Sequence, residues 1–61
     1  MSLNLHHVFH EGARKAEVYK HEYTKHWVVD CYVDLTRTRS RQFSTEQLAE
    51  NYAEDFVQDN L

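Results

Sequence analysis

The sequence contains no proline, one glycine and one cysteine in its 61 residues. With Cys31 as the only thiol, the chain can form neither an internal disulfide nor a cysteine-rich zinc site. No apolar run is long enough to cross a bilayer, and no signal-peptide pattern is visible, so we predict a cytoplasmic protein without a membrane segment. A chain of this length makes at most one domain, near the lower size limit for folding without metal or disulfides.

Catalytic motifs are also missing. There is no glycine-rich phosphate loop, no Ser/His/Asp signature and no HExxH motif. Asp30 and Asp34 would be separated by roughly 13 Å in an extended strand, too far to share a proton or one metal ion. Cys31 could be a nucleophile if a histidine activated it, but its apolar neighbours favour a small buried side chain. We therefore predict no enzymatic activity, no catalytic residues and no cofactor.

The segment 26–35 is the clearest strand and the best candidate for the centre of a small sheet. Its residues alternate between two faces with period two and are rich in β-branched and aromatic types. The face predicted to be buried carries Trp27, Val29, Cys31, Val33 and Leu35. The other face carries Val28, Asp30, Tyr32 and Asp34.

Two further strands are predicted around it. Residues 15–23 alternate as a strand, and the link 23–26 is short enough for a hairpin, although it lacks Asn-Gly or Asp-Gly. The polar stretch 36–42 is interpreted as a turn near 37–39 followed by a short third strand at about 40–43. If Phe43 faces the core there, Arg41 shares its face.

A helix is expected over about 45–58. Ser44 suits the N-cap and Gln47 would complete a capping box, with Phe43 and Leu48 as a hydrophobic staple. The apolar positions recur at three- and four-residue spacing; they are Leu48, Ala49, Tyr52, Ala53, Phe56 and Val57. Leu48, Tyr52 and Phe56 should press on the Trp27 face of the sheet.

Residues 1–14 allow three interpretations. They could form a short helix ended at Gly12, a strand with Leu3, Leu5, His7 and Phe9 alternating, or a flexible arm. We favour an N-terminal arm or short docking segment. The predicted fold is therefore α+β, with residues 15–61 forming a single ββ(β)α domain: a two- or three-stranded antiparallel sheet with one C-terminal amphipathic helix on one face.

The N-terminal segment also holds an H-H-x-x-H cluster. On a helix, His6 and His10 would share a face and could bind a divalent metal with Glu11, with His7 beside them. No fixed third ligand or supporting shell is evident in the sequence. We therefore predict ordinary polar histidines and no metal site.

The sheet face away from the helix is the leading candidate for function. Val28 and Tyr32, together with Tyr19 or Tyr23, would make an apolar and aromatic strip there, and tyrosine is favoured in interfaces. The predicted interface residues are Tyr19, Val28 and Tyr32. A small domain with one covered sheet face often completes its core by self-association. We predict a homodimer or higher homo-oligomer that can also bind another protein.

Charge is distributed unevenly along the chain, whose net charge is −3. All seven Lys and Arg lie within residues 14–41, and residues 42–61 carry five acids and no base. This asymmetry indicates either an interaction surface or, the reading we favour, an acidic helix pairing with basic strands. Arg37, Arg39 and Arg41, two residues apart, would project from one side of an extended chain.

Three patterns together suggest a family resemblance: V-Y, then W-V-V-D-C-Y, then R-x-R-x-F-S-T-E-Q-L-A-E-N-Y-A, over about residues 16–57. They resemble the arm-type DNA-binding domains of tyrosine recombinases, more distantly the AP2 plant domain, and also short bacteriophage proteins. The recombinase resemblance implies that the sheet face opposite the helix enters the major groove. By position, the groove-facing residues would be Lys20 or His21, Arg37, Arg39 and Arg41.

Charge opposes this implication, because Asp30 and Asp34 are expected on the same face and the whole chain is acidic. We therefore predict a non-enzymatic protein-interaction module, of the kind found among phage accessory proteins. DNA binding through the sheet and the Arg37–Arg41 segment is the alternative.

Overall fold

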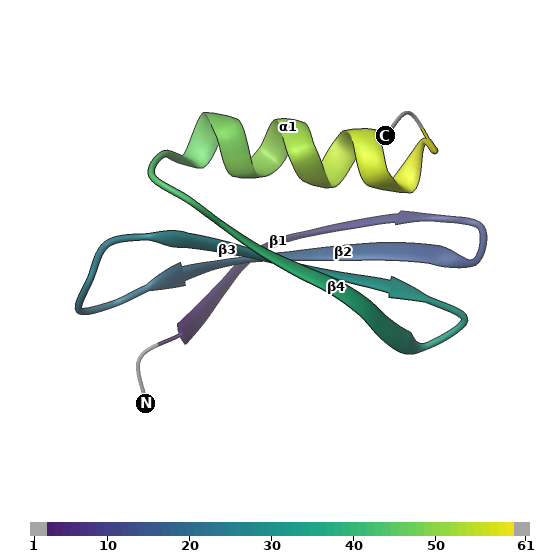
Figure 1. Ribbon diagram of the computed structural model, residues 1–61, viewed down its shortest axis with the longest axis horizontal. Helices are drawn as coiled ribbons and strands as arrows, with labels where there is room; N and C mark the ends of the chain where they lie inside the picture. The colour runs from purple at the N-terminus through teal and green to yellow at the C-terminus, as the bar shows by residue number, and fades with distance from the viewer. Residues whose placement is uncertain (1–2, 60–61) are drawn as a thin grey trace.

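The computed structural model describes residues 3–59 as two layers, a four-stranded antiparallel sheet and one helix across one of its faces (Figure 1). The elements are β1 (Leu3–Glu11), β2 (Arg14–His21), β3 (Trp27–Val33), β4 (Thr36–Phe43) and α1 (Glu46–Val57). The strands lie in sequence order, β1-β2-β3-β4. The α+β class with a C-terminal helix is confirmed, but the sheet has more strands than the two or three predicted.

The additional strand is β1, which covers most of the segment favoured as an arm or docking segment. It pairs with β2 through a two-residue turn, Gly12–Ala13, that leaves Glu11 opposite Arg14. Gly12 has φ +58°, a conformation that glycine adopts without steric cost, as the first central residue of a type II′ turn does. The single glycine therefore closes a hairpin and does not end a helix.

The β3–β4 turn corrects two expectations. Val33 pairs with Thr36, so the turn is Asp34–Leu35 and not residues 37–39. Both turn residues have positive φ, 52° and 69°, as a type I′ turn requires. Leu35 is 89% exposed, so its predicted place on the buried face is wrong, as is the placement of Asp34 within the strand.

The β2–β3 connection is a short link, as predicted, and the two strands pair antiparallel. The His21 amide donates to the His26 carbonyl at 2.8 Å, and the Lys25 amide donates to the His21 carbonyl at 3.0 Å. Lys25 has φ +65°, so this turn achieves its reversal without Asn-Gly or Asp-Gly.

The core lies between α1 and the two central strands (Figure 1). Its buried residues are Ala16, Val18, Trp27, Val29, Cys31, Ala49, Ala53, Phe56 and Val57. The predicted inward alternation of Trp27, Val29 and Cys31 and the burial of Phe56 are confirmed. Burial also raises the pKa of the Cys31 thiol, as expected for a side chain that acts as a small hydrophobe.

Leu48 does not press on the sheet as predicted, because half of it is exposed. At 3.6 residues per turn, the buried stripe is centred on Ala49 and Ala53. Leu48 then lies outside that stripe, whereas Tyr52 packs its ring at 5.3 Å from that of Phe43. Two small alanines, both 0% exposed, allow the helix to approach the sheet closely.

The N-cap of α1 is Thr45 and not Ser44. The Leu48 amide donates to Thr45 Oγ1 at 3.3 Å, while Gln47 donates to Asn51. The predicted N-cap is therefore wrong by one residue. With Thr45 as the cap, N3 is Leu48 and N′ is Ser44, so neither the predicted capping box nor the predicted staple forms. Both residues have a hydroxyl, so local sequence does not distinguish between them.

This one-residue shift has a measurable consequence. Thr45→Ala should lower the free energy of unfolding by about 1 kcal/mol, because the Leu48 amide loses its capping acceptor. Ser44→Ala is the matched control and should change it by less than about 0.5 kcal/mol, as for an ordinary surface substitution. Urea denaturation of both variants measures the difference; an equal loss in both would contradict the assignment of the cap.

The C-terminal end of α1 is held by a strand residue. Arg14 donates to the Phe56 carbonyl at 3.3 Å, lies 3.1 Å from the Asp59 carboxylate, and places its guanidinium 5.1 Å from the centre of the Phe56 ring. The last turn of the helix contains no basic residue of its own. Arg14 therefore supplies from β2 the positive charge that favours a helix C-terminus.

Candidate functional site

The sheet face that α1 leaves uncovered is organised in rows across the strands. Cross-strand pairing aligns Leu5, Tyr19, Val28 and Gln42 in one row. The next row is Val8, Glu17, Asp30 and Ser40, and the one after it is His10, Lys15, Tyr32 and Arg37. We call this surface the open face. It therefore presents an apolar row, an acidic row and a basic row side by side.

The open face holds all three residues predicted for an interface. Tyr19 and Val28 are direct cross-strand partners, whereas Tyr32 lies two rows away, beyond Asp30. Val28 is only 9% exposed, so it packs against its neighbours and contributes little accessible surface to this face. Tyr19 and Tyr32 are partly exposed and provide the aromatic surface.

Sequence reasoning missed the most exposed apolar part of this face, which comes from β1. Leu5 is 56% exposed, Leu3 46% and Val8 41%. The alternation of Leu3 and Leu5 is a strand pattern that could have indicated these exposed residues. The sequence alone did not show that this strand pairs with β2, so the pattern could not be assigned to the open face. A bulge between Leu5 and His7 then puts Val8 on the face of Leu5, which strict alternation does not predict.

Polar contacts on the open face fix its tyrosines. The Tyr19 hydroxyl donates to Glu17 Oε1 at 2.6 Å, and Lys15 Nζ lies 3.3 Å from Glu17 Oε2. The same Lys15 ammonium lies 4.7 Å from the centre of the Tyr32 ring. Ser40 donates to Asp30 at 2.8 Å. These contacts restrain both rings on the open face.

The Tyr19–Glu17 hydrogen bond also shifts the pKa values of both residues. It raises the pKa of Tyr19 to about 12, from an ordinary value of 10.0, and the same bond is the main reason that the pKa of Glu17 is lowered. Burial raises the pKa of Tyr32 as well. At neutral pH both open-face tyrosines therefore carry neutral hydroxyl groups beside an ionised Glu17.

An alkaline titration can test this pair. Because the pKa of Tyr19 is higher folded than unfolded, its stabilising contribution is complete below about pH 10 and is lost as the pH rises towards 12. Ultraviolet difference absorbance should show an ionisation step near pH 12 that is absent in Tyr19→Phe. In Glu17→Gln the step should move to lower pH, since the carboxylate no longer opposes ionisation; an unmoved step would contradict the assigned cause.

The alternation predicted that the three arginines of β4 project from one side of the strand, and this prediction is wrong. Arg39 and Arg41 pair with Cys31 and Val29 and share the helix-side face, while a bulge at Cys31–Tyr32 turns Arg37 to the open face. Arg39 donates to the Tyr52 hydroxyl at 3.0 Å. Arg41 donates to the carbonyl of its neighbour Ser40, and Arg37 lies 3.9 Å from the Asp30 carboxylate.

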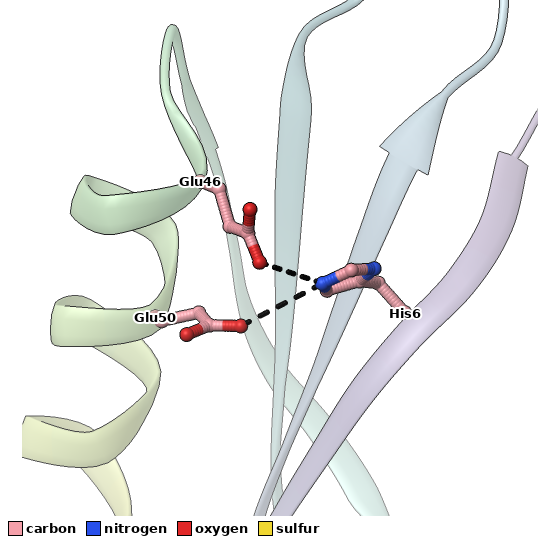
Figure 2. A group of neighbouring side chains, drawn as sticks. All are labelled: His6, Glu46 and Glu50. Atoms are coloured by element: carbon pink, nitrogen blue, oxygen red, sulfur yellow. Dashed lines mark hydrogen bonds and ion pairs between the residues drawn. The ribbon is translucent and has the colours of Figure 1, made fainter.

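A second group of polar side chains lies on the helix side of the molecule, between β1 and α1. Figure 2 shows Glu46 and Glu50 reaching from successive turns of α1 towards the ring of His6 on β1. His6 Nε2 lies 2.7 Å from Glu46 Oε2 and 3.8 Å from Glu50 Oε2. The H-H-x-x-H segment, considered and rejected as a metal site from the sequence, does not bring its histidines together, because His6 lies on the helix side while His10 pairs with Lys15 in an open-face row.

No pocket is found on the surface formed by residues 3–59. In the same part of the chain, no helix has the length and apolar character needed to cross a membrane. Comparisons with protein-family models, with curated proteins and with solved structures found no match. The resemblance to recombinase arm-type domains and to phage proteins stays a prediction.

Proposed function

We propose that this protein is a non-enzymatic interaction module that self-associates through its open face, with a second copy of the chain as the first partner. The supporting observation is the continuous apolar row of Leu5, Tyr19 and Val28 on the face opposite the helix, with exposed Leu3 and Val8 beside it. Single exposed apolar residues are common, but a contiguous apolar patch on a small domain indicates an interface.

The position of the apolar row favours a second copy over an unrelated partner. In a two-fold dimer each surface must complement itself. With a two-fold axis that runs along the apolar row, Leu5, Tyr19 and Val28 face the same residues of the second copy. An apolar row is self-complementary in this way, so no different partner surface is needed.

The area that a stable interface needs is a modest part of the surface of this molecule. A stable interface removes about 800 Å² of surface from each partner. The surface of this protein is 4134 Å², so one face of a two-layer molecule must supply about a fifth of it. Burial of the open face would convert a sheet covered on one side into a sheet covered on both, which relieves the shortage of core in a domain of this size.

Sedimentation velocity over a range of concentrations tests the proposal. The wild type should sediment as a dimer of the 7.4 kDa chain. Leu5→Lys should raise the dissociation constant at least about tenfold, because each dimer loses two buried leucines. Leu35→Lys is the matched control: the residue is 89% exposed in the β3–β4 turn, and its dimer should be unchanged.

Two outcomes would count against the proposal. A wild type that stays monomeric at the highest concentration would reject self-association. Equal weakening by both lysine substitutions would mean that the open face is not the interface. Circular dichroism of each variant must show a folded chain, since Leu5→Lys should leave the monomer intact at an exposed position.

DNA binding is the second candidate function, favoured by the exposure of β4 along most of its length. Arg37, Arg39 and Arg41 all lie on this edge strand, where guanidinium groups could contact phosphates. Fluorescence anisotropy with mixed-sequence duplex DNA should then show binding that weakens steeply with salt. Binding should fall when the three arginines are replaced by glutamine, and no binding at low salt would reject this function.

A further inference from the structure

We infer that His6, Glu46 and Glu50 form a binding site for a divalent transition-metal ion of the zinc type, which ties β1 to the first turns of α1. Their three ligand atoms, His6 Nε2 and one carboxylate oxygen from each glutamate, all lie within 4.8 Å of one another. The site is independent of the proposed function, because it lies on the helix side of the sheet and self-association would use the open face.

The donor set and its spacing fit zinc. Zinc takes imidazole nitrogen and carboxylate oxygen at about 2.0–2.2 Å, in tetrahedral geometry, which separates neighbouring ligand atoms by roughly 3.3 Å. His6 Nε2 lies 2.7 Å from Glu46 Oε2 and 3.8 Å from Glu50 Oε2. These separations bracket the required value, so small side-chain rotations would centre an ion among the three atoms.

His7 lies at the edge of this site. Its Nδ1 is 3.3 Å from the same Glu50 oxygen, but it is not one of the three ligand atoms that all lie within 4.8 Å of one another. A rotation of its ring would have to bring it closer before it could act as a fourth ligand. Successive strand residues normally point to opposite faces, yet both histidines point towards α1 because the β1 bulge lies between Leu5 and His7. Bulges commonly redirect a side chain beside a functional site.

The ligands are held from two elements. The His6 ring packs edge-on against Trp27, with ring centres 4.9 Å apart, which directs its Nε2 towards the helix. Glu46 and Glu50 are one helical turn apart and therefore project from the same side of α1. The site thus combines residues 40 or more positions apart in the sequence on two packed elements.

The charges of the side chains at this site favour a cation as the ligand. Within residues 3–59, the only ion-pair partners of Glu46 and Glu50 are His6 and His7. With both imidazoles neutral, two carboxylates one turn apart repel each other. A divalent ion would compensate both charges at once, and neutral imidazole with ionised carboxylate is the protonation state in which these groups bind metal.

Zinc titration of the full chain, prepared without a histidine tag, tests the site. Calorimetry should show one ion bound per chain, and the Tm should rise by roughly 20 °C at a zinc concentration about 100-fold above Kd. Glu50→Gln should weaken binding at least roughly 100-fold, more than the loss of an outer-shell partner does. His7→Ala should weaken binding less than Glu50→Gln does, because His7 lies at the edge of the site.

Two matched controls separate this site from general surface binding. Glu54→Gln changes the next exposed glutamate of α1, and His10→Ala removes a histidine from the other face of β1. Both should bind zinc like the wild type. Leu5→Lys should also bind normally, which separates failure of this site from failure of the proposed self-association.

The fluorescence of Trp27 can show whether a metal ion binds beside His6. It is the only tryptophan and its ring contacts that of His6, so paramagnetic Co²⁺ at the site should quench its fluorescence, and addition of Zn²⁺ should restore it. Quenching that is equal in Glu50→Gln and the wild type would overturn the assignment. So would the absence of any zinc heat or Tm change up to millimolar zinc.

Discussion

Replacing Phe56 with alanine should lower the free energy of unfolding by about 3–5 kcal/mol. Phe56 is 4% exposed and lies in the cluster that joins α1 to β2 and β3. Its truncation would leave a cavity at the helix–sheet interface and remove the ring over which the Arg14 guanidinium lies. In a domain this small, such a loss is a large share of the total stability.

Leu48→Ala is the matched control for Phe56→Ala. The residue lies on the same helix but is half exposed, so its truncation should cost less than about 1 kcal/mol. Chemical denaturation of both variants, with the wild type alongside, gives the comparison. A cost below 1 kcal/mol for Phe56→Ala, or equal costs for the two, would mean that α1 does not pack on the sheet with this face.

Ala53→Leu should lower the free energy of unfolding by about 1–3 kcal/mol, because the larger side chain has no room at the helix–sheet interface. Ala53 is 0% exposed, as is Ala49 one turn earlier. Alanine and leucine are both strong helix formers, so the change isolates packing from helix propensity. The loss should be visible as a lower midpoint in urea denaturation.

Glu54→Leu serves as the control for Ala53→Leu, since Glu54 is exposed on the same helix and glutamate is also a good helix former. The control should change the free energy of unfolding by no more than about 0.5 kcal/mol. If Ala53→Leu were neutral or stabilising, the helix and sheet would be farther apart than the burial of both alanines indicates.

Zinc binding and self-association would each compensate for the small hydrophobic core of this domain, in different ways. A 61-residue chain has little core, and such domains commonly depend on a metal ion or on association. A metal ion at His6 would fasten the outer strand β1 to the helix, whereas a second copy would cover the open face. The variants Glu50→Gln and Leu5→Lys separate the two contributions to stability.

The strength of the sequence patterns decided which predictions were correct. The alternation of Trp27, Val29 and Cys31 gave the buried face of β3 because period two is a direct consequence of strand geometry. The three- and four-residue spacing up to Phe56 gave the helix for the same kind of reason. Both were read without knowing any neighbour in space.

The errors lie where local patterns are ambiguous. Ser44 and Thr45 both suit an N-cap, and only the hydrogen bond from the Leu48 amide selects Thr45. Leu35 continues the alternation of the strand before it, but pairing of Val33 with Thr36 places it in a turn. Arg37 and Arg39 were expected on the same face of the strand, but a bulge in the pairing of β3 with β4 places them on opposite faces of the sheet.

The amino-acid sequence by itself determined the α+β class, the inward face of β3 and the apolar stripe of α1, because these follow from periodicity within one element. Tertiary structure alone decided that β1 joins the sheet, that Leu5 extends the row of Tyr19 and Val28, and that His6 meets Glu46 and Glu50. Those relations depend on strand register, bulges and helix placement, which arise from contacts between residues far apart in the chain.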